Sequence, residues 1–138
     1  MSYLRETKNL THRGVMAMLN AAVEKAEAIG QPQCIVIVDA SGELHAEIRM
    51  TGAKFLSRKS ALAKAMTAAS IGVETVCIPD EVRPLIGLAT EGKVTGLPGG
   101  LPIIVEGCLV GGIGVGSGTG VQDRDVALAG LQAIGAET

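Results

Sequence analysis

Residues 96–125 read GLPGGLPIIVEGCLVGGIGVGSGTGVQDRD, and ten of these thirty residues are glycine. Glycine lowers the stability of helices and strands, and it is used where the backbone needs unusual dihedral angles or approaches another group closely. The apolar segments 101–105 and 108–115, on either side of Glu106-Gly107, predict a β-hairpin. The stretch therefore predicts a tightly packed hairpin bracketed by two glycine loops, LPGG and GSGTG.

Apolar periodicity predicts three further elements before this stretch. Apolar residues recur every three or four positions over residues 11–29, which predicts an amphipathic helix with Thr11 as its N-cap and Gly30 after its end. The β-branched segment CIVIVD, residues 34–39, predicts a buried strand. Alternating residues over 43–50 predict a half-exposed strand that forms a hairpin with it.

Three more helices are predicted. The alanine-rich segment 57–72, which begins with a capping serine, predicts a helix that packs closely on a sheet or on another helix. A shorter helix is expected within residues 79–89, a closing helix over 122–134, and one more short strand near Val76. Strands paired as hairpins and separated by helices indicate an α+β fold with an antiparallel sheet. We expect residues 1–138 to form a single domain.

Composition narrows the class of protein. A chain of 138 residues that is 47% hydrophobic can bury a core without disulfides or a metal. The net charge of −2 and the presence of only one Tyr and one Phe argue against nucleic acid as a partner. No apolar run reaches the length of about 20 residues that spans a membrane, and the charged N-terminus does not resemble a secretory signal. We therefore expect a cytoplasmic protein whose partners do not include a membrane.

Two glycine motifs resemble nucleotide-binding loops, but neither matches the consensus sequence of such a loop. GLATEGKV, residues 87–94, has the GxxxxGK spacing, but Val94 stands where a hydroxyl should bind Mg²⁺. No register of GGIGVGSGTG gives GxGxxG, and the order of elements supplies no parallel βαβ unit. The segment GSGTGVQD before the closing helix fits either a backbone anion site or a simple turn.

A few side chains are candidates for chemistry. His12 and His45 are candidate ligands of haem iron, although a lone histidine is more often a surface residue. No metal other than haem iron is expected. Asp39, Arg49 and Asp123 are weak catalytic candidates, and aspartates at these places also serve turns and helix starts. No Ser/His/Asp or Cys/His arrangement can be argued from the order of residues.

The chain resembles the GlcG/HbpS-like family, also called haem-degrading, which includes the C-terminal domain of PduO-type corrinoid adenosyltransferases. The matching stretches follow the family order and are IVIVDASGEL (35–44), RMTGA (49–53), KAMTAA (64–69), LPGGLPI (97–103) and VGGIGVGSGTGVQDRDVALAG (110–130). The resemblance implies a sheet of about five antiparallel strands flanked by helices, as in profilin and PAS folds. It also implies tetramers or octamers, and haem binding in some members. It does not decide between His12, His45 and the hydroxyl of Thr119 as the ligand of haem iron. One departure is that the family commonly has Gly-Val-Ser-Gly-Gly where this chain has Gly-Val-Gly-Ser-Gly at 114–118.

These observations lead to a first hypothesis with two alternatives. The first is a cytoplasmic homo-oligomer that binds a small ligand, with haem or a related tetrapyrrole as the leading ligand. The site would lie between the two glycine loops and the first helix, and its binding residues would be Pro98, Gly99, Gly100, Gly116, Ser117, Gly118 and Thr119. An alternative is a small enzyme of a catabolic operon that acts on a glycolate- or aromatic-derived carboxylic acid, and a third reading is a scaffold without chemistry.

Overall fold

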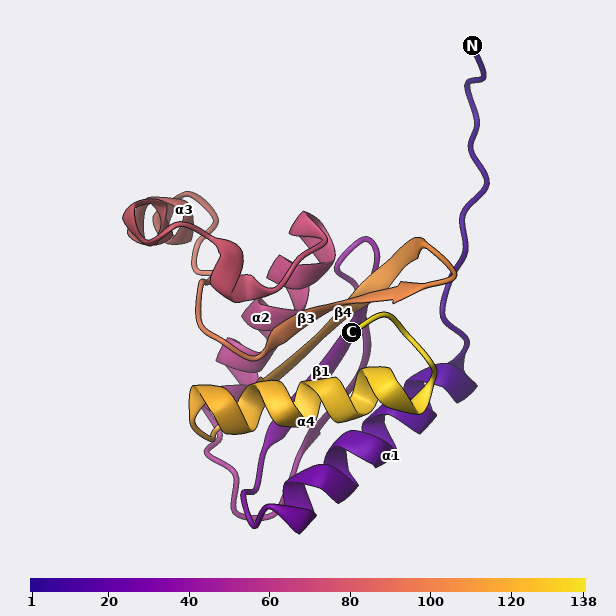
Figure 1. The fold of residues 1–138 in the computed structure, drawn as a ribbon. Helices are drawn as coiled ribbons and strands as arrows, with labels where there is room; N and C mark the ends of the chain where they lie inside the picture. The colour runs from indigo at the N-terminus through magenta and orange to yellow at the C-terminus, as the bar shows by residue number, and fades with distance from the viewer.

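The computed structural model describes all residues 1–138. The chain forms four helices, four strands and two short 3-10 turns, and Figure 1 shows how they are arranged. The helices and strands are α1 (His12–Ala28), β1 (Cys34–Asp39), β2 (Leu44–Arg49), α2 (Ser57–Ile71), α3 (Arg83–Ala89), β3 (Gly100–Val105), β4 (Cys108–Gly116) and α4 (Gly120–Ala133). The 3-10 turns are η1 (Thr75–Cys77) and η2 (Asp80–Val82). None of the helices is long and apolar enough to cross a membrane.

The four strands form one antiparallel sheet in the order β2-β1-β4-β3, which confirms the predicted α+β class. The sheet has four strands, whereas about five were expected, and the segment near Val76 lies in the 3-10 turn η1. The buried Thr75 explains this turn, because its hydroxyl donates to the Leu97 carbonyl and accepts from the Gly100 N–H. The segment is thus anchored by a side chain and not by a strand ladder.

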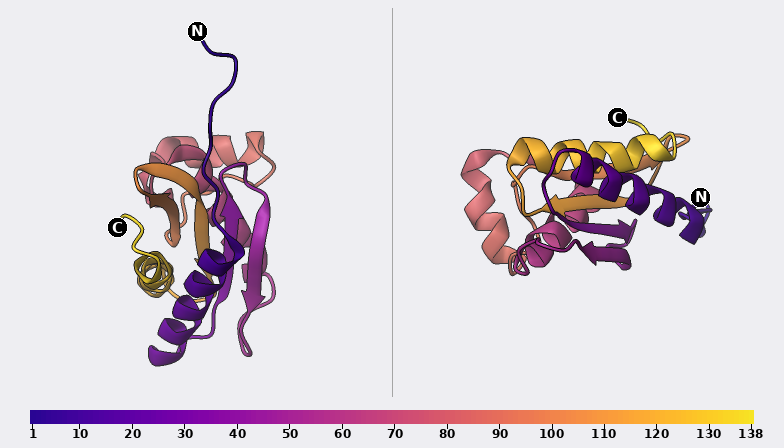
Figure 2. Two further views of the ribbon diagram at one scale, coloured as in Figure 1. Left: turned by 90° about the vertical axis from the view of Figure 1, so that its right-hand side faces the viewer. Right: turned by 90° about the horizontal axis from the view of Figure 1, so that it is seen from below.

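Helices cover both faces of the sheet (Figures 1 and 2). Helices α1 and α4 lie side by side on one face, where the larger apolar core contains Met18, Ile35 and Ile113. Helix α2 lies on the other face, where Val36 packs in a smaller cluster of small side chains. The apolar residues of β1 therefore serve two cores, since neighbouring side chains on a strand point to opposite faces.

The glycines of β4 are explained by the contact with α2. A Cβ atom on Gly114 would collide with the backbone carbonyl oxygen of Ala61, and one on Gly112 with that of Ala65. The alanine-rich helix therefore packs with its backbone against the sheet, as predicted from its small residues. The predicted serine cap is wrong, because the N-cap of α2 is Leu56, which makes no side-chain cap hydrogen bond.

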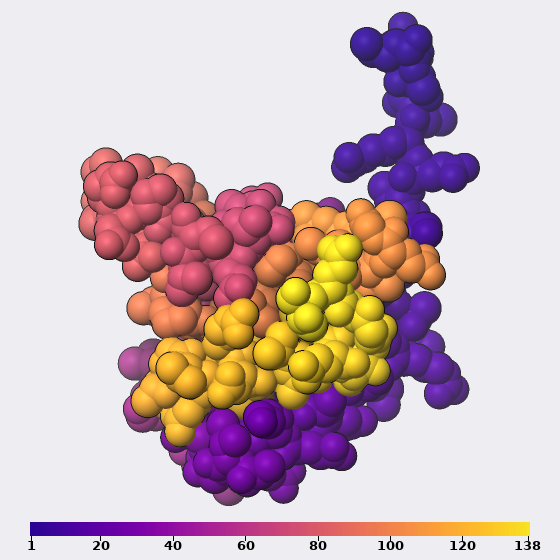
Figure 3. Space-filling view, viewed as in Figure 1, coloured from indigo at the N-terminus to yellow at the C-terminus, as the bar shows by residue number.

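Two parts of the chain project from this body (Figures 1 and 3). The first nine residues are exposed and form neither helix nor strand. The predicted helix within 79–89 is confirmed as η2 followed by α3, which has no buried residue. Leu85 and Leu88 on α3 are 67% and 80% exposed.

The three cysteines differ in exposure, and this leads to a prediction. Cys34 is buried in β1, Cys108 is partly buried and Cys77 is exposed. Burial raises the pKa of the Cys34 thiol, and the charges of Arg49 and Arg58 offset part of this effect. Because the thiolate is the reactive form, Cys77 should react first with a thiol reagent such as DTNB, and Cys34 only after unfolding. Replacement of Cys77 by serine should remove the fast phase, and a fast phase that persists would contradict the assignment.

Candidate functional site

The two glycine loops meet at the end of the sheet where β4 ends and β3 begins, and they border a small polar pocket. This pocket has a volume of about 270 Å³, and only one of its ten lining residues is hydrophobic. Pro98 comes from the first loop, and Ser117 and Gly118 come from the second. Helix α2 and the residues before it contribute Lys54, Ser57, Ser60 and Lys64, and α4 contributes Gly120 and Asp123.

An ion pair between Lys64 and Asp123 lies at this pocket. The Lys64 Nζ is 3.0 Å from Asp123 Oδ2, and each side chain is 5% exposed. The same ammonium donates to the Val115 carbonyl oxygen over 2.7 Å. Since Lys64 lies on α2 and Asp123 on α4, the pair joins helices from opposite faces of the sheet. A lysine ammonium has three N–H donors, and two of them are used by these partners.

The first glycine loop packs directly on this ion pair. A Cβ on Gly99 would lie 2.8 Å from Asp123 Cβ and 3.4 Å from Lys64 Nζ, and one on Gly100 would collide with the backbone carbonyl of Lys64. Gly99 also has φ of +111°, a backbone conformation that residues with a side chain rarely adopt. The glycines of this loop therefore allow the chain to approach the buried charges closely.

The second glycine loop contains a strained residue, Ser117, with φ of +103°. Its hydroxyl oxygen accepts a hydrogen bond from the Lys54 backbone N–H over 3.0 Å, which helps to hold this conformation. The resemblance places a glycine at this position in many relatives, and the positive φ gives a physical reason for that preference. In this chain the serine adds a hydroxyl to the pocket wall.

The expected anion concavity before the closing helix is occupied by a carboxylate of the chain itself. The N–H of Gly118 donates to Asp123 Oδ1 over 3.0 Å. Thr119 is the N-cap of α4 and forms a capping box with Gln122, so the helix begins two residues earlier than predicted. Gly118 and Thr119 therefore have structural partners within the chain.

A second buried polar group lies beside the same loop. Gln33 is fully buried, and neither its amide nitrogen nor its amide oxygen has a hydrogen-bond partner. A Cβ on Gly118 would lie 2.9 Å from Gln33 Nε2 and 3.0 Å from Asp123 Oδ1. Gly118 is thus confined by polar side chains. The unpaired amide of Gln33 is unusual, because buried polar groups without partners are uncommon in folded proteins.

Sequence reasoning did not predict a place at the site for Lys54, Lys64, Gln33, Ser57 or Ser60. One signal was available for Lys64, which lies three residues after Ala61 and four before Ala68 on the packed face of α2. A lysine at such a position is buried only when it is paired. The partner lies 59 residues away, so no local pattern could have identified it.

The remaining predicted residues lie elsewhere. Asp39 is paired in register with Gly111, whereas Cys34, at the pocket end of β1, is paired with Gly116. Five residues of strand separate the two ends, a distance of about 17 Å. The Asp39 carboxylate accepts N–H groups of the following turn, from Ser41 and Glu43. Asp39 thus serves the β1–β2 turn in this structure.

Arg49, His45 and His12 are all exposed. Arg49 lies opposite Cys34 on the edge strand β2, at the pocket end of the sheet, but it does not line the pocket. His45 is the extra residue of a β-bulge between Ile37 and Val38, near the opposite end. His12 begins α1, whose 17 residues extend about 25 Å. Gln31, just beyond the far end of that helix, contacts Ser117 through its side chain. The structure therefore does not bring either histidine to the glycine loops.

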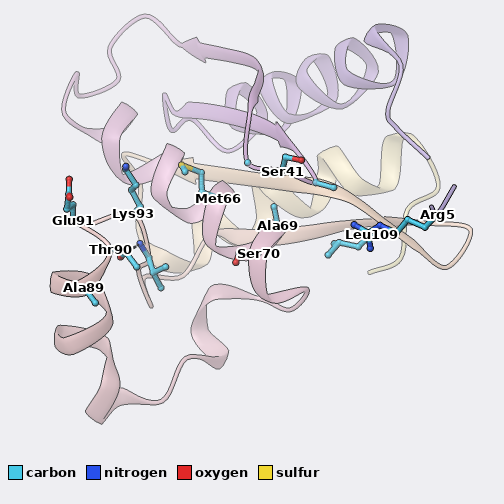
Figure 4. A pocket seen from close by; sticks show the side chains of 13 residues that line it. Arg5, Ser41, Met66, Ala69, Ser70, Ala89, Thr90, Glu91, Lys93 and Leu109 are labelled. Carbon is cyan, nitrogen blue, oxygen red and sulfur yellow. Dashed lines mark hydrogen bonds between the residues drawn. The ribbon is translucent and has the colours of Figure 1, made fainter. Parts of the chain in front are cut away.

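A larger hollow of about 880 Å³ lies on another part of the surface (Figure 4). Met66 and Ser70 of α2 lie on one side of it, and Thr90 and Lys93, which follow α3, lie on another. None of the residues predicted for the site lines this hollow.

Together, these features define an α+β domain with helices on both faces of a four-stranded antiparallel sheet and a small polar pocket at one sheet end. The chain belongs to the family described as haem degrading protein HbpS-like, whose sequence model matches residues 10–132. The family inferred from the sequence is thereby confirmed.

Three relatives illustrate this membership. The corrinoid adenosyltransferase PduO of Salmonella typhimurium is 34% identical over 134 residues, which are 94% of this chain and 40% of PduO. The crystal structure of a PduOC:heme complex is 32% identical with a TM-score of 0.88, over 95% of this chain and 99% of that one. The ORFY protein of Klebsiella pneumoniae is 27% identical with a TM-score of 0.93, over 100% of this chain and 99% of that one. The chain thus spans about two fifths of PduO.

Proposed function

We propose that this protein binds haem or a related tetrapyrrole as a homo-oligomer in the cytoplasm. The observation that carries the proposal is the match along 95% of the chain to a structure that contains haem, at 32% identity. Membership in a family described as haem degrading supports the same ligand class.

Two exposed histidine side chains are suited to bind haem iron. Both His12 and His45 are exposed, and neither imidazole is engaged in a hydrogen bond or ion pair with the rest of the chain. A neutral imidazole with a free nitrogen is the commonest protein ligand of metals, and histidine is a frequent ligand of haem iron. Met16, one turn after His12 on α1, is 58% exposed and offers an apolar neighbour.

The positions of the two histidines explain why we propose that a second copy of the chain completes the haem site. Neither histidine lines any of the larger hollows of the monomer. A site for a large apolar ligand usually covers most of the ligand surface. A neighbouring subunit would therefore have to cover the porphyrin face that one chain leaves open. Haem would supply the redox-active iron, and the imidazole of His12 or His45 would hold that iron.

Titration of the purified protein with hemin tests the proposal. We expect a saturable shift of the Soret band with the wild-type chain. Replacement of the ligating histidine by alanine should weaken binding at least about tenfold, as a loss of about 1.4 kcal/mol produces. His12→Ala, His45→Ala and the double variant are compared with Glu24→Ala, an exposed residue of α1 that serves as the matched control. Sedimentation of the same samples reports the oligomeric state.

Each outcome bears on a separate part of the proposal. A wild-type protein without a saturable Soret shift would overturn haem binding. A shift that is unchanged in the double variant would overturn the histidine ligands and retain haem as the ligand. A haem-loaded monomer would overturn the role of the second copy.

A further inference from the structure

We propose that the pocket between the two glycine loops is a binding site for a small oxyanion, the carboxylate or phosphate group of a small molecule. This site is separate from the proposed haem site, because neither His12 nor His45 lines it. The lining residues that can donate to an anion are Lys54, Lys64, Ser57 and Ser117, whereas the Ser60 hydroxyl already donates to the Ser57 carbonyl oxygen.

The charges around the pocket favour an anion. Lys64 is neutralised by Asp123, but Lys54 forms no ion pair within the chain, so the three charged residues of the wall sum to a positive charge. The pocket is also lined by Ser57, the first residue of α2. The N-terminus of this helix carries a partial positive charge that adds to that of Lys54.

The donors around the pocket are suited to oxygen atoms. Lys64 retains one N–H donor beyond those given to Asp123 and Val115, and its ammonium is almost fully buried. The Ser117 hydroxyl accepts from the Lys54 N–H, which leaves its own O–H free to donate. Hydrogen bonds from a buried ammonium to a carboxylate or phosphate oxygen are among the strongest in proteins.

The size of the pocket limits the ligand. Its volume of about 270 Å³ lies just below the range of about 300–1,000 Å³ that holds drug-sized ligands. Only one of the ten lining residues, Leu97, is hydrophobic. The site therefore fits a small polar metabolite with an anionic group and excludes a tetrapyrrole.

Titrations of the full chain with inorganic phosphate and with acetate test this site, with binding measured by calorimetry and by the backbone amide signals of Ser117 and Gly118. We expect saturable binding of at least one anion, with both amide signals moving at the same dissociation constant. Lys54→Met should weaken binding about tenfold or more, since it removes a charged hydrogen bond. Ser57→Ala should weaken it about three- to tenfold, because the Ser57 hydroxyl makes no hydrogen bond within the chain and can donate to the anion.

Lys59→Met is the matched control, because Lys59 is an exposed lysine five residues after Lys54, in the first turn of α2, and does not line the pocket. Binding by this variant should stay within about twofold of wild type. Saturation with phosphate alone would identify a phosphate ligand, and saturation with acetate alone would identify a carboxylate. The absence of saturation with either anion would overturn the site. Equal weakening by Lys54→Met and Lys59→Met would also overturn it, because it would indicate nonspecific attraction.

Discussion

Replacement of Asp123 by asparagine is expected to lower the free energy of unfolding by about 3–5 kcal/mol, the cost of breaking a buried ion pair on one side. The substitution keeps the shape and an oxygen that can accept from Gly118, but it leaves the Lys64 ammonium 5% exposed without a counter-charge. Urea denaturation at several protein concentrations measures the loss and separates it from any change in assembly.

Two variants control this prediction. Lys64→Met combined with Asp123→Asn removes both charges, and it should be more stable than Asp123→Asn alone, because no unpaired charge stays buried. Glu47→Gln breaks the ion pair with Arg58, in which the Arg58 side chain is 57% exposed, and it should cost only about 0–1 kcal/mol. If Asp123→Asn lowers the free energy of unfolding by no more than Glu47→Gln does, the buried pair does not join the two helices as described.

Gly114→Ala should lower the free energy of unfolding by about 3 kcal/mol or more. This loss lies at or beyond the upper end of the range for substitutions that overpack a core. The added methyl group would collide with the backbone carbonyl of Ala61 and lie 2.5 Å from the backbone nitrogen of Ala65. Backbone atoms cannot rotate away as a flexible side chain does, so α2 would have to move off the sheet. Thermal and urea unfolding measure the change.

Gly14→Ala is the matched control for this substitution. Gly14 lies inside α1 with an ordinary φ, and an added Cβ would have ordinary contacts 3.7 Å from Leu10 and Thr11. Alanine should therefore stabilise the protein by about 0.4–1 kcal/mol. A Gly114→Ala variant with nearly the stability of wild type would show that α2 and β4 are not in close contact.

Local patterns were sufficient for most of the fold. The helix that begins after Thr11, the hairpin of β1 and β2, and the hairpin of β3 and β4 were predicted within a few residues of their observed bounds. These elements are encoded by apolar periodicity, caps and turns, all of which act over a few neighbouring residues. The short strand expected near Val76 failed because the side chain of Thr75 bonds across to Leu97 and Gly100.

The candidate site was predictable only in part. The two glycine loops were expected to act together, and the structure brings Pro98, Ser117 and Gly118 to one pocket. The same reasoning grouped the loops with the first helix. His12, however, is the first residue of α1, and it is Gln31, just beyond the opposite end of that helix, that contacts Ser117. The residues that were chosen for their chemistry alone therefore do not lie together in the folded chain.

The sequence by itself determined the class of fold, the family and the places where the backbone must be glycine. It did so because periodicity, helix caps and turn residues are local properties of the chain. Only the tertiary structure decided what those glycines are for: Gly112 and Gly114 admit the backbone of α2, and Gly99 admits a loop onto the ion pair of Lys64 and Asp123. That pairing depends on how α2 and α4 pass the end of the sheet, and such a long-range arrangement leaves no periodic signal in the sequence.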